Sequence, residues 1–583
     1  MKKLLFYAFA AIAVLSCTSL DDVEKRLDNV KQDIVILQQA FGSGKIVTEV
    51  KQVTTGSGGW EITFSDNTHI TLINGLFDGI EESDGYITFT LTDNTSFKFK
   101  MVPKTVEPRL ITMTIRASDN AWLLVNDARC EVIGDSVVEC WVDHLMSSKD
   151  LIVRFEYKGD RVTLDGVSAI SGETAINYKQ PVKMLVYSGV KTKGYTVYVH
   201  AFTGLPVLWI ETEGHQDITS KDYYLRAYAR LVEDVRTRGA GDVIEDSLGI
   251  KGRGNSTWGM PKKPYRLKLD NKQALFGEPK DKSWVLLNNY ADKSMLRTQT
   301  AFYMGRISNL DYTPSSHFVE LMLNGRYNGT YLLCDKLKID KNRVNVGDDG
   351  FLLEVNTDTR VTSEDVTFRV NHIRQPLNIK EPDNITVNDE NYNYVKDYLT
   401  QADAVLFSDK FTDADEGWRK YIDMDSFVDW YLINEISKNN DAIFFSSCYM
   451  NLARGGKLKM GPLWDFDISF GNVNYNNNFD TTGFWIKRVD WISRMFEDPI
   501  FVSRVKERFD YFYSHKNDIM REINENAEYL RYAAQENEGR WHTFYTYNWP
   551  NYDIWGSYNN EVQLMKDWIN TRFEWLKGEV EKL

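Results

Sequence analysis

Apolar residues recur at heptad spacing near the start of the chain, with charged or amide residues between them. The apolar positions are Leu20, Val23, Leu27, Val30, Ile34, Leu37 and Phe41. Positions of this kind form the seam between supercoiled helices, so the pattern predicts a short coiled coil within residues 17–45. About three heptads are marginal for a lone helix, and we expect the segment to join subunits of a homo-oligomer or to act as a stalk. The alternative is an amphipathic helix that packs on the next domain.

The spacing then changes to strict alternation of apolar and polar residues. WEITFSDNTHITL at 60–72 and YITFTLTDNTSFKFK at 86–100 each contain an Asp-Asn pair between two alternating runs. This arrangement predicts a repeat of β-hairpins and a small β module over residues 46–104. Residues 105–204 contain further short strands with no helical period, which predicts an immunoglobulin-like β-sandwich that acts as a spacer or adhesion module.

From residue 205 to residue 583 the predicted strands alternate with longer helical segments. Asn324-Gly325 lies between two apolar runs and predicts a tight hairpin. A helix is expected from about Asp292 to Ile307, packed on two sides because its apolar residues form no single stripe. The last segment, 561–583, predicts an amphipathic helix. The chain is therefore expected to be multidomain, with a coiled coil and all-β modules followed by an α+β domain at residues 205–583.

Composition limits the class of protein. The chain has 583 residues, 43% of them hydrophobic, which is enough for several cores. Its formal net charge of -14 argues against nucleic acid as the main partner, because phosphate binding needs a basic surface.

The first residues predict export and lipid anchoring. MKKLLFYAFAAIAVLSC begins with two lysines, continues with a short apolar run and ends in Cys17. This is the pattern of a bacterial lipoprotein signal peptide, residues 1–16, with Cys17 as the lipid-modified first residue of the mature chain. We expect a cell-envelope protein held by its lipid in the outer membrane of a Gram-negative bacterium, facing either the periplasm or the exterior. Cys130 and Cys140 lie in one β-rich stretch, where they either pair or remain free thiols.

The strongest chemical signal is GPLWDFD at 461–467. Asp465 and Asp467 flank one aromatic residue in an apolar segment, as carboxylates that present oxygens to a divalent cation do. Asp441 precedes them by a segment that predicts a short hairpin. A base, a hairpin and a metal-binding aspartate in this order suit phosphoryl transfer. The alternative is a set of surface acids in loops, since the chain has 83 Asp and Glu residues.

A second signal lies in GRGNST at 252–257 and the strand that follows it. The small residues, backbone N–H groups and hydroxyls suit phosphate oxygens, with Arg253 as a charged clamp and Asn255 and Ser256 beside it. In PYRLKLD, Lys268 alternates with apolar neighbours and is predicted to reach a cleft. The equally weighted alternative is a basic surface hairpin in which Lys268 is solvated.

Five segments together resemble the CotH family, the spore-coat-protein-H-like atypical protein kinases. They are GRGNST with KKPYRLKL, KSMLR, VELMLNGRYNGTYLL, DMDSFVDWYLINEISKNND and GPLWDFDISFG, in the family's order. The resemblance implies a kinase-like two-lobed fold, ATP, a divalent metal (Mg²⁺ or Mn²⁺) and transfer of phosphate to protein hydroxyls. In that family a catalytic aspartate precedes the metal-binding aspartate across a hairpin, which maps onto Asp441 as the base and Asp465 as a metal ligand. The chemistry of the neighbouring residues suits the same roles, with Asp467 as a second metal ligand, Lys268 neutralising phosphate charge, and Arg253, Asn255 and Ser256 along the phosphates.

The sequence departs from ordinary protein kinases at several positions. No HRD precedes Asp441, and Ser446 stands where those kinases place a metal-binding Asn. The helix expected from Asp292 has no Glu to pair with Lys268, so Glu320 or another acid would have to serve.

We therefore expect transfer of the ATP γ-phosphate to Ser or Thr of a secreted or envelope protein. Two alternatives stay open. One is a noncatalytic surface lipoprotein that uses the same fold, or the aromatic segment 541–560, to bind a glycan or protein. The other is an assembly factor built on the coiled coil.

Overall fold

The computed structural model describes residues 20–54, 58–73, 77–91, 94–101, 106–120, 127–143, 150–178, 180–233 and 243–583. The chain divides into two compact units, Met1–Ala201 and Phe202–Leu583. The predicted signal peptide and Cys17 lie outside the described residues. Within the described ranges, none of the helices combines the length and apolar character that crossing a bilayer would require.

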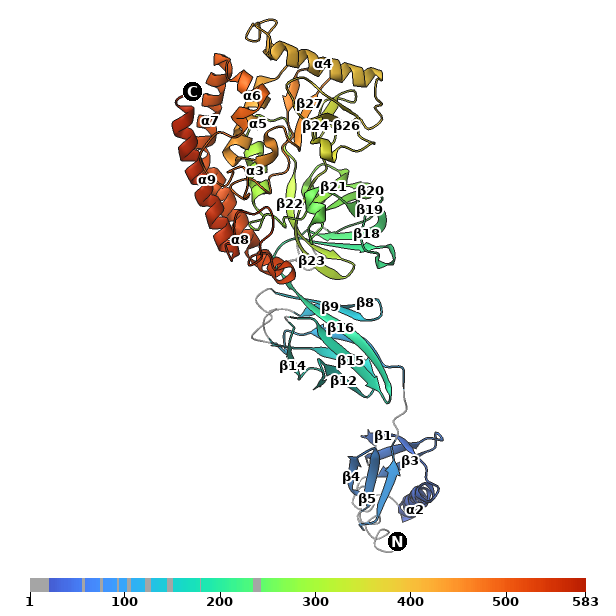
Figure 1. Ribbon diagram of the computed structural model, residues 1–583. Coiled ribbons are helices and arrows are strands. Elements are labelled where there is room, and N and C mark those ends of the chain that lie inside the picture. The colour runs from blue at the N-terminus through green and yellow to red at the C-terminus, as the bar shows by residue number, and fades with distance from the viewer. Residues whose placement is uncertain are drawn as a thin grey trace. The chain divides into compact units, whose positions relative to one another are not determined.

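The described part of the N-terminal unit starts with helix α2, which is followed by two small antiparallel sheets (Figure 1). The elements are α2 (Leu20–Gly42), then β1 (Val47–Val53), β2 (Gly59–Phe64) and β3 (His69–Ile73) in one sheet, and β4 (Phe77–Ser83), β5 (Tyr86–Leu91) and β6 (Ser96–Lys100) in the other. The predicted hairpins are β2–β3 and β5–β6, and their turns place Asn67 and Asn94 at φ 62° and 64°. Each sheet also contains a preceding strand, β1 or β4, that the alternation did not predict.

Helix α2 packs onto the β module through its C-terminal half. Ile34, Leu37 and Ala40 are buried in one cluster with apolar residues of both small sheets. This packing is the alternative that the heptad pattern left open, because the apolar stripe has a surface within its own chain to cover it. Pairing of α2 with a second copy stays a prediction.

The remaining described residues of the N-terminal unit form ten further strands. They are β7 (Arg109–Ile115), β8 (Ala128–Ile133), β9 (Val137–Asp143), β10 (Asp150–Ile152), β11 (Arg154–Lys158), β12 (Arg161–Leu164), β13 (Val167–Ala169), β14 (Ala175–Asn177), β15 (Val182–Ser188) and β16 (Lys191–Phe202). The all-β prediction agrees with this, but eight strands follow one continuous order, β11-β7-β8-β9-β16-β15-β12-β13, instead of two separate sheets. Strand β11 contacts β15 across the core. Cys130 and Cys140 face each other on β8 and β9 and form a disulfide.

The C-terminal unit contains a closed barrel of seven strands. In barrel order these are β17 (Val207–Thr212), β18 (Leu225–Val232), β19 (Val243–Gly252), β20 (Tyr265–Gln273), β21 (Asp281–Leu287), β23 (Arg326–Asp335) and β22 (Ser316–Leu323). Alternate apolar residues of every strand fill its interior. The β22–β23 turn is the predicted Asn324-Gly325 turn, with both residues at positive φ.

A second sheet and a group of helices complete this unit. The sheet has the order β25-β26-β24-β27-β28, with β24 (Phe351–Val355), β25 (Thr367–Phe368), β26 (Leu377–Glu381), β27 (Cys448–Leu452) and β28 (Leu458–Met460). The helices are α3 (Arg297–Arg306), α4 (Glu390–Leu406), α5 (Met424–Ser437), α6 (Asp490–Met495), α7 (Pro499–Ser514), α8 (Lys516–Trp541) and α9 (Tyr558–Val580).

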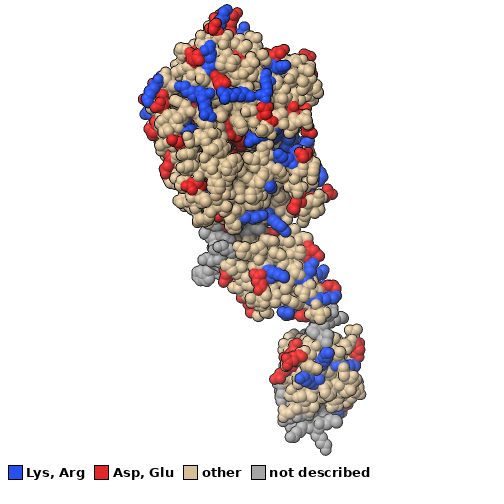
Figure 2. All heavy atoms as spheres, viewed as in Figure 1, with Lys and Arg blue, Asp and Glu red and all other residues tan. Residues whose placement is uncertain are grey.

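The helices lie beside both sheets instead of forming a separate lobe. In Figure 1, α7, α8 and α9 line one side of the C-terminal unit, and α5 lies between them and the second sheet. Helix α8 also contacts β23 of the barrel. Helix α3 begins five residues later than predicted, because Asp292 and Ser294 form a turn before it, and most of its residues are buried as expected. The face shown in Figure 2 carries acidic and basic side chains interspersed among uncharged ones.

Candidate active site

One cavity of 560 Å³ in the C-terminal unit brings together residues that are far apart in sequence. Its lining comes from residues 253–260, 440–449, 464–468 and 475–476, with Glu354, Arg360, Arg488, Trp549 and Pro550. Six of the predicted site residues are in this lining: Asp441, Asp465, Asp467, Arg253, Asn255 and Ser256. Lys268 is not. The structure thus joins the two chemical signals that the sequence showed separately.

The GRGNST loop follows β19 and depends on its glycines. A Cβ on Gly252 would lie 2.3 Å from the ring of Trp258, and a Cβ on Gly254 would lie 2.2 Å from Thr257 Oγ1. Gly254 also has φ +83°, which side-chain-bearing residues seldom adopt. The loop therefore turns tightly into a short 3₁₀ helix, Ser256–Gly259, and presents its backbone and small side chains to the cavity.

Arg253 points from this loop toward the acidic residues. Its guanidinium lies 5.5 Å from the ring centroid of Trp464, next to Asp465. Burial lowers the pKa of Arg253, and the nearby Asp465 charge opposes that shift. In the described parts of the chain, no ion pair is formed by the Arg253 side chain. A cation held in this way is available to an anionic ligand.

The structure corrects the prediction for Lys268. Leu267 and Leu269 point into the barrel, as expected, but Lys268 is exposed on the outer face of β20 and does not line the cavity. The cavity lies at the end of β20 that is next to the GRGNST loop. Successive residues of a strand are about 3.3 Å apart, so Lys268, the fourth residue of β20, lies away from that end. Glu320 does not pair with Lys268 either. It is buried on β22, where it accepts a hydrogen bond from Tyr327 at 3.0 Å.

Asp441 lies just beyond the C-terminal end of α5. Lys438, which follows the last residue of the helix, has the left-handed conformation. Asn440–Ala442 then form a 3₁₀ turn that aims Asp441 into the cavity. Asn440 Nδ2 donates to Asp441 Oδ1 at 2.9 Å, and Ser446 Oγ donates to Oδ2 at 3.2 Å. Burial raises the pKa of Asp441, and the charge of Asp465 raises it further. A carboxylate in this state accepts a proton more readily than a solvated one.

Asp465 and Asp467 occupy the segment after the β27–β28 hairpin. Asp465 has φ +65°, and its Oδ2 accepts a hydrogen bond from Ser447 at 3.1 Å. Burial is the main reason that the pKa of Asp467 lies well above its usual range. The negative charges of Asp465, Asp292 and Asp441 raise this pKa further. Such a concentration of carboxylates is stabilised by a proton or a cation.

These carboxylates suit a hard divalent cation, although they do not form a tight ready-made cluster. Among the described residues, no three or more His, Cys, Asp or Glu side chains are close enough together to hold a metal ion. Asp465 and Asp467 nevertheless supply oxygen ligands on the same cavity wall, where their mutual repulsion favours a bound cation. Mg²⁺ commonly takes one or two protein carboxylates and completes its shell with water and phosphate oxygens, so the residues fit Mg²⁺ held jointly with a nucleotide.

Several positioning residues were not predicted. Arg297 on α3 pairs with buried Asp292 at 2.5 Å, and its Nε donates to the carbonyl of Ser469 at 3.1 Å. Asn472 donates to the carbonyl of Asp467 at 2.8 Å. The KSMLR segment therefore holds the chain that follows the aspartates. Glu354, also in the cavity lining, was missed although it is the one charged residue in the apolar strand FLLEV.

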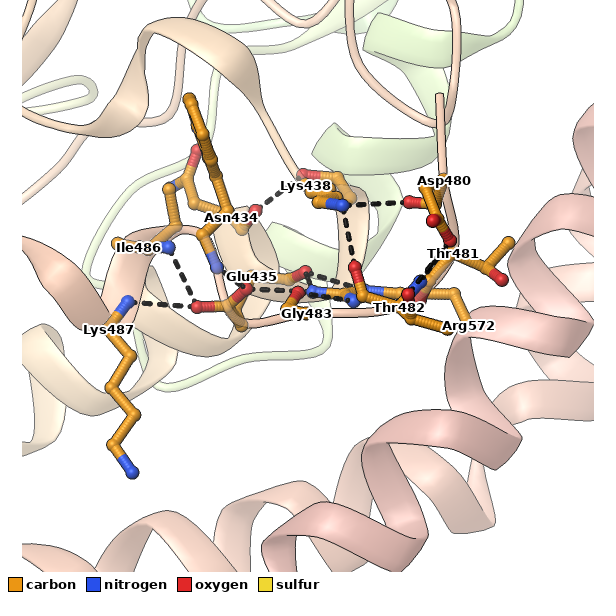
Figure 3. Close-up of polar contacts among 12 residues, drawn as sticks. Asn434, Glu435, Lys438, Asp480, Thr481, Thr482, Gly483, Ile486, Lys487 and Arg572 are labelled. Atoms are coloured by element: carbon orange, nitrogen blue, oxygen red, sulfur yellow. Dashed lines mark hydrogen bonds and ion pairs between the residues drawn. The ribbon is translucent and has the colours of Figure 1, made fainter. Parts of the chain in front are cut away.

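A buried network fixes the other side of the cavity (Figure 3). Arg572 on α9 pairs with Glu435 on α5 at 2.8 Å and donates to the carbonyls of Thr481 and Gly483. Lys438 Nζ donates to the carbonyls of Asn477, Asp480 and Thr482. These contacts attach the segment after the aspartates to the end of α5, so that Tyr475 and Arg488 reach the cavity.

Comparison with known proteins agrees with this geometry. Residues 250–576 match the family described as CotH kinase protein, and the match spans more than half of the 583 residues. The chain therefore belongs to the CotH kinase family, as its five segments suggested. Membership implies a kinase-like enzyme that uses ATP.

Other comparisons add little. No curated protein matches the chain. Among solved structures, a candidate glycoside hydrolase from Bacteroides thetaiotaomicron aligns with 31% of this chain and 51% of its own, at 18% identity and a TM-score of 0.15. The chain thus spans about half the length of that protein, and a TM-score this low does not define a common fold.

Proposed function

We propose that the C-terminal unit is a Mg²⁺-dependent protein kinase that transfers the γ-phosphate of ATP to a Ser or Thr hydroxyl of a secreted or envelope protein. The observation that carries the proposal is that Asp441, Asp465, Asp467 and the GRGNST loop line one cavity within the region that matches the CotH kinase family. The order of base, hairpin and metal-binding aspartates along the chain also agrees with phosphoryl transfer.

Each group has a separate role in this mechanism. Asp465 and Asp467 would hold Mg²⁺, which when bound neutralises charge on the phosphate oxygens. Arg253 and the backbone of the GRGNST loop bind and orient the phosphates, in place of Lys268. Asn255 and Ser256 lie on the same loop and add polar contacts.

Asp441 acts on the acceptor. The acceptor oxygen attacks the γ-phosphorus, its proton passes to the Asp441 carboxylate, and the bond between the γ-phosphorus and the bridging oxygen breaks with its electron pair leaving on ADP. Asn440 and Ser446 hold the two Asp441 oxygens by hydrogen bonds, so the carboxylate is oriented before the acceptor arrives.

A binding experiment tests the nucleotide site. ATP with Mg²⁺ should raise the melting temperature of the protein, because a ligand at a hundred times its Kd stabilises the fold by about 2.7 kcal/mol. Asp465→Ala should abolish the shift and Arg253→Ala should reduce it. Lys268→Ala, at an exposed position outside the cavity, is the matched control and should leave it intact.

A transfer experiment separates the enzyme from a binding protein. Labelled ATP incubated with the protein and an envelope extract should label a protein band, and Asp441→Asn should abolish the label without removing the ATP-dependent melting shift. A noncatalytic glycan-binding or protein-binding role is the second candidate, favoured by the exposed aromatic side chains Tyr545 and Trp549, 74% and 59% accessible. Absence of both label and melting shift would favour that role and reject the kinase.

A further inference from the structure

Two arginines line the cavity near Asp441 and take part in no ion pair within the part of the chain that the structure describes. Arg360 Nη1 donates to Ser446 Oγ at 2.6 Å, and Ser446 in turn donates to Asp441. The guanidinium carbon of Arg488 lies 3.4 Å from the ring centroid of Trp485. Four acidic residues line the cavity, and three of them are the proposed catalytic and metal-binding aspartates. Because these acids have other roles and, in the described ranges, form no ion pair with Arg360 or Arg488, the two arginines are available to a ligand.

The position of Arg488 is fixed although its charged group is exposed. The Glu435 carboxylate accepts hydrogen bonds from the backbone nitrogens of Trp485, Ile486 and Lys487, at 2.7, 2.8 and 3.0 Å. Arg572 holds Glu435 from the other side, and both partners are almost fully buried (Figure 3). The turn that carries Arg488 is therefore rigid, which lowers the entropy cost of binding an anion there.

The cations of the cavity fall into two groups by their neighbours. Arg253 interacts with Asp465 and belongs with the proposed nucleotide contacts. Arg360 is linked through Ser446 to Asp441, the residue that must come within hydrogen-bond reach of the acceptor hydroxyl. Side chains that flank the hydroxyl would then meet Arg360 and Arg488. A guanidinium presents paired N–H donors that match a carboxylate.

A substrate peptide bound in an extended conformation would also contact an aromatic surface in this part of the cavity. Tyr475 and Trp549 stack with ring centroids 6.1 Å apart and planes 16° apart, and both line the cavity. Asn440 Nδ2 donates to Tyr475 Oη at 3.3 Å, so this aromatic pair is connected to the loop that carries Asp441.

We propose that Arg360 and Arg488 form an acceptor subsite that selects Ser or Thr hydroxyls flanked by acidic side chains. The inference rests on the proposed kinase function and adds the class of substrate. It commits to a polypeptide acceptor with carboxylate groups near the hydroxyl.

The test measures phosphate transfer by the full protein to three synthetic Ser peptides, with acidic, neutral or basic flanking residues. The acidic peptide should have a KM at least about tenfold below that of the basic peptide. Arg488→Gln should raise the KM for the acidic peptide about tenfold and leave the KM for ATP unchanged. Arg488→Glu should reverse the preference, and Arg488→Lys, which keeps the charge, should retain it. Arg521→Gln, an exposed arginine on α8 outside the cavity, is the matched control.

Several outcomes would overturn the inference. Equal KM values for the three peptides would remove the selectivity while leaving the kinase proposal in place. A rise in the KM for ATP in Arg488→Gln would assign the arginine to the nucleotide, and transfer to glycan hydroxyls alone would assign the subsite to a sugar. Absence of transfer to any acceptor would reject the kinase and the subsite together. Melting temperatures equal to that of wild type would show that the changed KM values of the variants do not come from misfolding.

Discussion

At the scale of single residues, several side-chain-bearing residues in and beside the site adopt a backbone conformation that such residues seldom take. Phe444, Ser447 and Asp465 all have positive φ, as does Lys438 at the end of α5. Such residues cost on the order of 1–3 kcal/mol each and persist only where their surroundings hold them. Here Ser447 donates a hydrogen bond to Asp465, and Lys438 donates one to the carbonyl of Asp480, which supplies that support. The strain agrees with a preorganised site.

Asp467 provides a prediction about pH. Burial and neighbouring carboxylates raise its pKa in the folded state, so the folded protein binds a proton more tightly than the unfolded chain. The stability that this proton contributes is present below the ordinary Asp pKa and is lost as the pH rises through the raised value. Asp467→Asn should therefore be more stable than wild type at neutral pH, by on the order of 1 kcal/mol per unit of raised pKa.

Urea unfolding at several pH values checks this prediction. The difference between Asp467→Asn and wild type should shrink as the pH falls, and should vanish below the ordinary Asp pKa, where Asp467 is protonated in both the folded and the unfolded chain. Mg²⁺ with ATP should stabilise wild type more than the variant. A constant difference at all pH values would contradict the raised pKa.

The GRGNST loop has no room for a side chain at Gly254. Gly254→Ala adds a Cβ that would collide with Thr257, so the loop should shift and ATP affinity should fall about tenfold, which is 1.4 kcal/mol. Gly455 in the β27–β28 turn is the matched control, because it has a similar φ of +75° but open space around its Cβ position. Calorimetric titration with ATP should show a loss in Gly254→Ala and none in Gly455→Ala.

At the scale of elements, α5 and α9 determine the shape of the cavity without lining it. Arg572 and Glu435 are both about fully buried, and their contacts reach the segment 480–487 that leads to Arg488. Removing one partner of a buried pair leaves an uncompensated charge.

Arg572→Met should therefore lower the free energy of unfolding by about 3–5 kcal/mol. Arg504 on α7 offers a matched control, because it forms a partly exposed pair with Asp425, and Arg504→Met should cost at most about 1 kcal/mol. Urea unfolding monitored by tryptophan fluorescence measures both. Similar losses in the two variants would show that the Arg572 network is less important than its burial suggests.

The disulfide between β8 and β9 should affect the stability of the N-terminal unit only. It closes a short loop, since Cys130 and Cys140 are 10 residues apart. Replacing both with Ser should destabilise the N-terminal unit by about 2–3 kcal/mol through a freer unfolded chain. Calorimetry should show a lower transition for that unit and an unchanged transition for the C-terminal unit. Shifts in both transitions would contradict the assignment to one unit.

At the scale of the whole molecule, the chain combines an N-terminal β-rich unit with a catalytic candidate in the C-terminal unit. The proposed lipid at Cys17 would hold both at a membrane surface, and Cys17→Ser should abolish labelling with radioactive palmitate and release the protein into the soluble fraction. Fractionation and labelling of cells that express the variant check this. Retention of Cys17→Ser in the membrane would reject the lipoprotein assignment.

The sequence alone determined the class of elements and the chemical groups. Alternation at 60–100, the Asn324-Gly325 turn and the order of Asp441, hairpin and Asp465 are local patterns, and the physics that creates them acts over a few residues. From such patterns it also predicted the aspartates and Arg253 as site residues, and its five segments indicated the family that the comparison shows.

Only the tertiary structure decided which groups share the cavity. Lys268 and Arg253 are both basic residues near the same loop, but Lys268 lies on the outer face of barrel strand β20, whereas Arg253 lies in the loop after β19 and faces Asp465. Arg360 and Arg488 come from distant segments, held there by Ser446 and by Glu435 with Arg572. Heptad spacing likewise could not tell whether α2 meets another helix or its own β module. Each of these outcomes depends on contacts between residues far apart in the chain, which no local pattern records.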